Sequence, residues 1–321
     1  MRLDDINEIG IIGLGTMGAI FAQIFAQAGY RVNGYEANQQ SLQTAKKVIR
    51  ANLAEQLNSE ENDSDDLESV MARIQYGNSI GSAVEKADIV IEAVNENREI
   101  KETVFREIDM SLPEQSKILS NTSTLDIYPL VPERRLSNTI IAHWFAPPHI
   151  IPLVEVVKGK QTSEDTVSTT MSLLESLGKV PVLIKKFVPG FVINRILRII
   201  GREVFHLLGE DIISPEQLDL AIKASIAPRM MVLGLVQRYD FTGLELSARN
   251  LKDESFYDPP YDNEPEPLVS RVNRGDLGVK AGKGFYDYGG RNIEEILQER
   301  DTHLKRVFES TAFCLEKKRL V

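Results

Sequence analysis

Three glycines near the amino terminus, Gly13, Gly15 and Gly18, form a G-x-G-x-x-G pattern. The pattern follows an apolar run at residues 9–12 and precedes a stretch rich in Ala, Phe and Ile, as expected where a strand turns into a helix. There the first glycine allows a tight turn, the second lets the backbone approach a diphosphate, and the third lets helix and strand pack closely. Free amides at the helix start attract the negative charge. The residues expected to hold a dinucleotide diphosphate are Gly13, Gly15, Thr16, Met17 and Gly18.

A carboxylate, Glu36, directly follows the next strand candidate at residues 31–35. In dinucleotide sites an acidic residue about 20 positions beyond the glycines accepts hydrogen bonds from the ribose hydroxyls. The same carboxylate would repel the 2′-phosphate of NADP⁺, and no Arg or Lys stands between Glu36 and Lys46 to compensate. NAD⁺ is therefore the expected cofactor. FAD remains an alternative, because flavin and nicotinamide proteins share the glycine pattern.

Four later segments contain side chains suited to acid–base chemistry: Ser120-Asn121-Thr122-Ser123, Ala142-His143-Trp144-Phe145, Pro152-Leu153-Val154-Glu155 and Pro189-Gly190-Phe191-Val192-Ile193-Asn194-Arg195. With Gly278-Val279-Lys280-Ala281-Gly282-Lys283-Gly284-Phe285-Tyr286 after them, the chain resembles the L-3-hydroxyacyl-CoA dehydrogenase family. That family's pattern runs through S-N-T-S, H-x-F-x-P, L-V-E and P-G-F-x-x-N-R to G-x-K-x-G-x-G-F-Y. The resemblance covers almost the whole chain. It implies NAD-dependent oxidation of a 3-hydroxyacyl-CoA, such as 3-hydroxybutyryl-CoA, in fatty acid metabolism.

The resemblance assigns the catalytic base to His143 and its carboxylate partner to Glu155. An imidazole has a pKa close to 7, and a neighbouring carboxylate fixes its tautomer and stabilises its charged form. By resemblance, Ser123 and Asn194 donate hydrogen bonds to the developing carbonyl oxygen. The alternatives are a structural histidine, a water-exposed glutamate at a strand end, and two helix caps.

By the same resemblance, Glu96, Lys101 and Asn121 are expected to line the nicotinamide side of the cofactor. The alternative is that they are only polar loop residues. The other three histidines lack metal-ligand spacing with one another. We therefore expect no metal.

Three features depart from the members that act on acyl-CoA. Those members commonly carry Asn where this chain has Ala146, and residues 147–152 read Pro-Pro-His-Ile-Ile-Pro, as in relatives that act on free hydroxy acids. Where those members present lysines, residues 51–72 carry acidic side chains and no Lys or Arg. This stretch either solubilises the surface or shapes substrate entry, and it would repel a CoA phosphate. Carnitine, gulonate or a hydroxymethylpyridine carboxylate are therefore alternative substrates.

Two further hypotheses are a structural protein and a dehydrogenase of a different mechanism. A crystallin-like structural protein of the same fold would not need the four candidate catalytic residues that this chain retains. A hydroxyisobutyrate-type dehydrogenase uses a catalytic lysine, and the pattern of His143 and Glu155 argues against it.

The elements that position these residues change type along the chain. Short β-branched runs at residues 9–12, 31–35, 88–92, 118–120, 139–142, 153–157 and 180–184 alternate with amphipathic stretches, which predicts right-handed βαβ units and a mostly parallel sheet. After residue 188 only helical patterns remain. We expect an α/β Rossmann-like NAD-binding domain at residues 1–187 and an all-α substrate and dimerisation domain at residues 188–321. Apolar stretches such as residues 230–236 predict a homodimer through that second domain.

Composition narrows the partners. The 321-residue chain is 42% hydrophobic, enough for two cores, and its net charge of −10 disfavours nucleic acid and anionic membranes. No apolar run approaches the roughly 20 residues of a membrane span, so we expect a cytoplasmic enzyme with a small-molecule substrate. The single cysteine, Cys314, excludes an intramolecular disulfide. The basic clusters at residues 185–186 and 317–319 are expected to be solvated surface.

Overall fold

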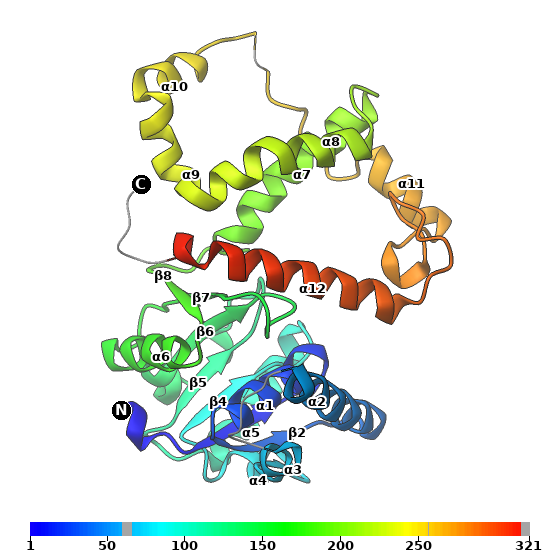
Figure 1. Cartoon of the computed structure of the whole chain (residues 1–321). Coiled ribbons are helices and arrows are strands. Elements are labelled where there is room, and N and C mark those ends of the chain that lie inside the picture. The colour runs from blue at the N-terminus through cyan, green and yellow to red at the C-terminus, as the bar shows by residue number, and fades with distance from the viewer. Residues whose placement is uncertain (60–65, 256, 316–321) are drawn as a thin grey trace. The chain divides into compact units, whose positions relative to one another are not determined.

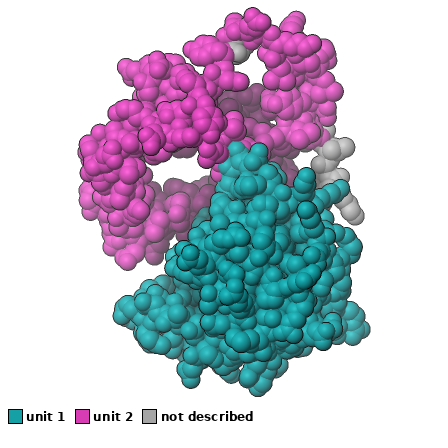
Figure 2. Space-filling view, turned by 180° about the vertical axis from the view of Figure 1, so that it is seen from behind, with its two compact units in different colours: residues 1–195 teal, residues 196–321 magenta. Residues whose placement is uncertain are grey.

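The computed structural model describes residues 1–59, 66–255 and 257–315, and it divides into two compact units, Met1–Arg195 and Ile196–Val321 (Figure 2). The division falls inside a helix, after the boundary at residues 187/188 that the sequence predicts. The limits of the functional domains therefore stay a prediction. None of the helices that the described residues form is long and apolar enough to cross a membrane.

Unit 1 contains one sheet, which the described residues build from eight strands in the order β3-β2-β1-β4-β5-β6-β7-β8 (Figure 1). The strands are β1 (Glu8–Ile12), β2 (Arg31–Tyr35), β3 (Ile74–Tyr76), β4 (Ile89–Glu92), β5 (Lys117–Ser120), β6 (Thr139–Trp144), β7 (Leu153–Val157) and β8 (Val180–Ile184). Seven of them were expected from the sequence. The three-residue strand β3 was missed, because Ile-Gln-Tyr is too short to show a period.

All neighbouring strands are parallel except β6 and β7, which run antiparallel. Only residues 145–152 lie between these two strands, and a parallel crossover needs about a dozen residues or more. The antiparallel register places His143 directly opposite Glu155. The short connection therefore creates the pairing on which the candidate active site depends.

Helices cover both faces of the sheet. They are α1 (Thr16–Gln27), α2 (Gln39–Ser59), α3 (Leu67–Ala72), α4 (Ile80–Val84), α5 (Arg98–Ser111) and α6 (Glu164–Ser176). Buried side chains of α1, α2 and α6 share one core with Ile89 and Ile91, whereas those of α4 and α5 share the other with Val90. This alternation is the period of two that a strand imposes. It makes a strand buried on both faces read as a continuous apolar run.

Unit 2 is helical, as expected, and its helices are α7 (Ile193–Gly209), α8 (Pro215–Ala221), α9 (Ala227–Thr242), α10 (Leu244–Asn250), α11 (Glu266–Arg274) and α12 (Ile293–Thr311) (Figure 1). The hydroxyl of Ser214 accepts the Gln217 N–H and caps α8. The fold class, a Rossmann-like domain followed by a helical one, is confirmed. Of the acidic segment, α2 and α3 supply the ends, and residues 60–65 lie outside the described residues.

Candidate active site

The glycine loop joins β1 to α1. Gly13 has a φ of +93°, and a Cβ on Gly18 would lie 1.8 Å from the carbonyl oxygen of Gly13. Apart from its chain neighbours, no described residue has an atom within 4 Å of the Cβ position of Gly15, so this side of the loop is open. Gly15 is the N-cap of α1 and offers no side-chain cap to the first-turn amides. The loop is therefore shaped to receive an anionic group against backbone N–H donors, which fits a dinucleotide diphosphate.

Glu36 follows the end of β2 and lies beside this loop. Its Oε2 accepts the Leu14 N–H at 2.9 Å, and its Oε1 accepts the Asn38 N–H at 3.0 Å. Both amides fix the carboxylate next to the open side of the glycine loop. The position fits the ribose-binding role expected from the sequence.

His143 and Glu155 face each other across β6 and β7. The His143 Nδ1 lies 3.0 Å from Glu155 Oε2, and the two residues are only 5% and 1% exposed. Glu155 Oε1 accepts the N–H groups of Val192 and Ile193 at 3.0 and 2.9 Å. Burial raises the pKa of Glu155, but the hydrogen bonds from His143 and the two amides outweigh burial and hold this pKa below its ordinary value. Glu155 is therefore a charged, fixed partner for the imidazole and not a water-exposed strand end.

The loop that carries Ser123 is organised by Glu96. Glu96 Oε1 accepts the Thr122 hydroxyl at 2.8 Å and the N–H groups of Ser123 and Thr124 at 2.9 and 2.8 Å. Burial raises the pKa of Glu96, but these hydrogen bonds and the nearby Lys101 together lower it by more. The net effect is a pKa below the ordinary value. A charged Glu96 thus holds the backbone of the loop in one conformation. Its contact with a cofactor stays a prediction.

Lys101 is buried beside Glu92, a residue that the sequence did not single out. Its Nζ lies 2.6 Å from Glu92 Oε1 and 3.5 Å from Glu96 Oε2, and Lys101 and Glu92 are 1% and 0% exposed. Ser120 donates its hydroxyl to Glu92 Oε2 at 2.5 Å. The Lys101 ammonium group is therefore paired within the protein. It links Glu92 at the end of β4 to Glu96 in the segment between β4 and α5. Glu92 lies at the end of a strand and Lys101 in the following helix, so no sequence pattern within one element indicates that they form a pair.

Asn121 and Asn194 were both predicted from the sequence, and the structure places them next to residues that hold His143 and Glu155. Asn121 Oδ1 accepts the Trp144 N–H at 2.9 Å, which ties the loop after β5 to the residue that follows His143. Asn194 lies in the first turn of α7 and follows the amide that binds Glu155. Within the described part of the chain, no protein group forms a hydrogen bond with the Ser123 hydroxyl or with the side-chain amide of Asn194. Both side chains therefore keep donors for another molecule.

Phe191 is a further residue that sequence reasoning left without a role of its own. It is fully buried with a φ of +51°, and its ring centroid lies 5.4 Å from that of His143. The Phe145 ring lies 4.6 Å from His143 by the same measure. Both aromatic rings therefore pack against the imidazole and restrict its orientation. The signal was the P-G-F segment itself, since a glycine before a buried aromatic residue indicates a tight turn.

Comparison with known proteins decides the family. Residues 8–187 match the NAD-binding domain of 3-hydroxyacyl-CoA dehydrogenases, and residues 190–288 match their C-terminal domain. The chain belongs to the 3-hydroxyacyl-CoA dehydrogenase family. It is accordingly an NAD-dependent oxidoreductase, and the cofactor expected from Glu36 and the glycine loop is confirmed.

Relatives in this dehydrogenase family differ in what they act on. The chain is 33% identical to a 5-formyl-3-hydroxy-2-methylpyridine 4-carboxylate 5-dehydrogenase of Mesorhizobium japonicum, over 94% of this chain and 97% of that one. It is 34% identical to a probable 3-hydroxybutyryl-CoA dehydrogenase of Bacillus subtilis, over 88% and 98%. The crystal structure of a 5-formyl-3-hydroxy-2-methylpyridine 4-carboxylic acid 5-dehydrogenase, described as an NAD⁺-dependent dismutase, is similar with a TM-score of 0.83 and 30% identity, over 96% and 99%. The family thus includes a pyridine carboxylate enzyme and an acyl-CoA enzyme.

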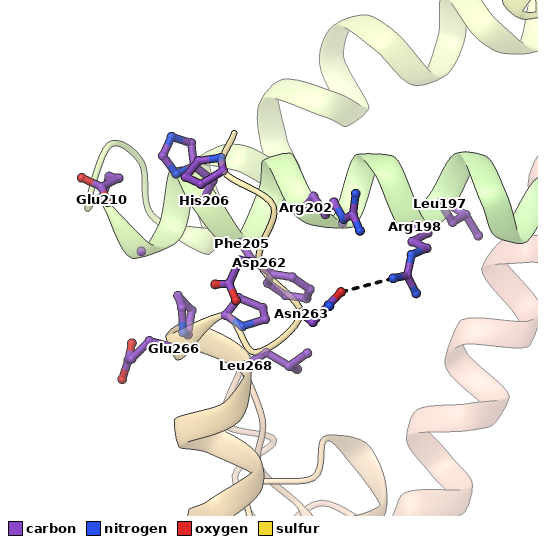
Figure 3. Close-up of a pocket in the computed structure, with 15 residues that line it drawn as sticks. Leu197, Arg198, Arg202, Phe205, His206, Glu210, Asp262, Asn263, Glu266 and Leu268 are labelled. Atoms are coloured by element: carbon purple, nitrogen blue, oxygen red, sulfur yellow. Dashed lines mark hydrogen bonds between the residues drawn. The ribbon is translucent and has the colours of Figure 1, made fainter. Parts of the chain in front are cut away.

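A cavity of about 710 Å³ lies within unit 2. Figure 3 shows side chains of α7, among them Arg202 and His206, around this cavity opposite the segment at residues 260–268. Arg198 donates to Asn263 Oδ1 at 3.3 Å across it. None of the candidate catalytic residues lines the cavity, so we do not assign the chemistry to it. Among the described residues, no group of three or more His, Cys, Asp or Glu side chains is placed to hold a metal.

Proposed function

We propose that this dehydrogenase oxidises a hydroxyl group of a free hydroxy acid, with His143 as the catalytic base. The observation that carries the reaction class is the buried contact between His143 Nδ1 and Glu155 Oε2. The two amides on Glu155 Oε1 hold that carboxylate in place. Such a pair can take up a proton from a substrate hydroxyl and return it.

The mechanism follows from which atoms are occupied. Because Nδ1 of His143 donates to Glu155, Nε2 is the nitrogen that accepts the proton of the substrate hydroxyl. Glu155 then stabilises the imidazolium. Ser123 and Asn194 donate hydrogen bonds to the oxygen as it becomes a carbonyl. The glycine loop and Glu36 would hold NAD⁺, whose nicotinamide ring would accept the hydride from the carbinol carbon. In the reverse direction the imidazolium donates its proton to that oxygen.

The preference for a free acid is supported by the charges on α2. Lys46 Nζ lies 4.4 Å from the centroid of the Tyr76 ring, and Arg50 pairs with Glu68. Lys46 and Arg50 are thus engaged within the protein, Lys47 is exposed and forms no ion pair with a described residue, and residues 51–72 contain no Lys or Arg. A CoA phosphate would therefore meet net negative charge there. The similarity to a pyridine carboxylate enzyme along nearly the full length of both chains supports the same preference.

Oxidation of a 3-hydroxyacyl-CoA is the second candidate. It is favoured by the motif set that runs from Ser120 to Tyr286 and by the similarity to a probable 3-hydroxybutyryl-CoA dehydrogenase. A screen of NADH release separates the two candidates. Free 3-hydroxybutyrate and 3-hydroxybutyryl-CoA form a matched pair that differs only in the thioester, and carnitine, gulonate and hydroxymethylpyridine carboxylates extend the set of free acids. We expect the highest kcat/KM with a free acid. A thioester that outperforms every free acid would establish the second candidate, and no turnover at all would favour a structural, crystallin-like role.

The same assay tests the base. His143→Gln should lower kcat by about 10²- to 10⁴-fold, the usual effect of losing a general base, and leave NADH affinity unchanged. His206→Gln, on α7 in unit 2, is the matched control and should retain activity. Loss of NADH affinity in step with activity would show that His143 acts structurally.

We also propose that unit 2 pairs with a second copy of the chain. Among its described residues, only Pro267 is fully buried, so this unit lacks a core of its own. Large apolar side chains exposed on its helices include Leu197, Ile199, Val236, Phe241, Leu244 and Leu251. A homodimer would bury such surface. Light scattering after gel filtration should give twice the chain mass, and Val236→Asp should shift it toward monomer. A wild-type monomer at micromolar concentration would refute the proposal.

A further inference from the structure

A second cavity, in unit 1, is lined by four lysines. Its volume is about 400 Å³. The lining residues relevant here are Lys158, Lys160, Lys185, Lys186, Asp126, Tyr128 and Phe187. None of the candidate catalytic or cofactor-binding residues is among those that line it. The cavity is therefore separate from the candidate active site.

The fold assembles this cluster from two distant parts of the sequence. β7 and β8 are parallel and pair Val157 with Ile184, so the residues after both strands emerge side by side. The Lys158 N–H donates to the Ile184 carbonyl at 2.9 Å, which places Lys158 next to Lys185. Lys160 follows one residue beyond Gly159. Each lysine pair alone resembles ordinary solvated surface, and only the register joins them.

Part of the lining of this cavity is aromatic. The Tyr128 hydroxyl donates to the Val157 carbonyl at 2.5 Å, and a Cβ on Gly159 would lie 2.4 Å from the Tyr128 ring. Glycine at this position lets the lysine-bearing loop approach the ring. Phe187 adds a second aromatic side chain to the lining. The lining of the cavity thus combines two aromatic side chains with four lysines.

The lysine charges of the lining are largely without opposite charges beside them. Lys158 pairs with Glu164, whose side chain is 82% exposed. Lys160, Lys185 and Lys186 form no ion pair or side-chain hydrogen bond with any described residue. Asp126 is the one carboxylate of the lining, and its Oδ1 accepts the Tyr128 N–H at 3.2 Å. Four positive charges and one negative charge thus surround a cavity in a chain whose net charge is −10, and their mutual repulsion favours an anion between them.

We propose that this cavity binds a small anion with two or more negative charges, with an apolar part against Tyr128 and Phe187. Lysine ammonium groups bind phosphate as point charges and do not require the planar geometry of an arginine site. A phosphate ester and a polycarboxylate share this chemistry. The size of the cavity excludes a macromolecule and fits a metabolite.

Calorimetric titration tests the site, with inorganic pyrophosphate and citrate as the two probes and acetate as a monoanion at matched ionic strength. The protein is first saturated with NADH, because the glycine loop would otherwise bind the pyrophosphate. We expect saturable binding of one probe per chain and none of acetate. Tighter binding of pyrophosphate would identify phosphate as the ligand group, and tighter binding of citrate would identify carboxylates.

Variants separate a site from general charge. Lys160→Glu/Lys185→Glu should weaken binding about tenfold or more, equivalent to about 1.4 kcal/mol. Lys86→Glu/Lys252→Glu makes the same change in net charge at exposed positions elsewhere and should bind as wild type does. Asp126→Asn keeps the acceptor for the Tyr128 N–H and should strengthen binding. Absence of binding to wild type, equal weakening in both double variants, or weaker binding to Asp126→Asn would each overturn the proposal.

Discussion

Replacing Lys101 by Met should destabilise unit 1 strongly. The Lys101 ammonium lies 2.6 Å from Glu92, and both residues are at most 1% exposed. Removing one partner of such a pair leaves a buried charge and costs about 3–5 kcal/mol. Glu92 keeps two donors, the Ser120 hydroxyl and the Val94 N–H. These donors offset part of the loss, so we expect about 3 kcal/mol. For a unit of 195 residues, about 2–4 °C per kcal/mol predicts a fall in Tm of about 6–12 °C.

Urea unfolding followed by tryptophan fluorescence measures this effect directly. Trp144 is the only tryptophan of the chain and is buried in β6, so its signal reports on unit 1. The measurement is made without NADH, because a bound cofactor adds its own stabilisation. Arg106→Met is the matched control. Its pair with Glu102 is exposed at the surface, and its loss should cost below about 1 kcal/mol.

A double variant tests the cause of the loss. Lys101→Met/Glu92→Gln removes both charges and should recover much of the stability, since an amide is far cheaper to bury than an unpaired carboxylate. The reasoning is refuted if Lys101→Met costs no more than Arg106→Met. It is equally refuted if the double variant is no more stable than Lys101→Met alone.

The other predictions concern the cofactor site and the carboxylate of the pair. Gly15→Ala should weaken NADH binding and lower the urea midpoint only slightly, because its Cβ meets no described residue beyond its chain neighbours and the cost is that of Ala at an N-cap. Gly18→Ala should weaken NADH binding and lower the midpoint far more, because its Cβ would lie 1.8 Å from the Gly13 carbonyl oxygen. Equal midpoints for the two variants would contradict this account. Glu36→Ala should narrow the ratio of kcat/KM for NAD⁺ over NADP⁺ by about tenfold, about 1.4 kcal/mol of repulsion removed, and a wild type that uses both cofactors equally would disprove the role of Glu36. The folded-state pKa of Glu155 lies below its ordinary 4.5, so its ionised form contributes stability above pH 4.5 that is lost as pH falls through the folded-state pKa. Urea midpoints across acidic pH should therefore show Glu155→Gln closing its gap to wild type, and a gap that widens toward low pH would reverse the sign assigned here.

Local signals were sufficient for the cofactor loop and for the identity of the catalytic candidates. The glycine pattern lies between a strand and a helix that follow each other directly, and the conformation of such a turn depends on a few neighbouring residues. Glu36 follows the next strand by the same local logic. His143 and Glu155 were recognised from short motifs, and no contact between them had to be known.

The contacts among distant residues were decided by tertiary structure. The antiparallel register of β6 and β7 sets His143 against Glu155, and the arrival of Val192 and Ile193 supplies the amides that keep this glutamate charged. Glu92 and Lys101 form a buried pair only because α5 packs against the end of β4. No periodicity marks such a pair in advance, since burial depends on which elements cover a position.

The lysine cavity shows the same division. From the sequence, residues 185 and 186 are an exposed basic pair. The sequence also correctly indicates the two strands, β7 and β8, that precede Lys158 and Lys185. The sequence does not indicate that β7 and β8 pair in parallel with Val157 beside Ile184, which brings Lys158 and Lys160 to the same cavity. Strand existence depends on the local pattern of side chains, whereas strand neighbours depend on the packing of the whole sheet. The sequence therefore determined the residue types that could do chemistry and the elements that carry them, and the register of the folded sheet decided which of those residues meet.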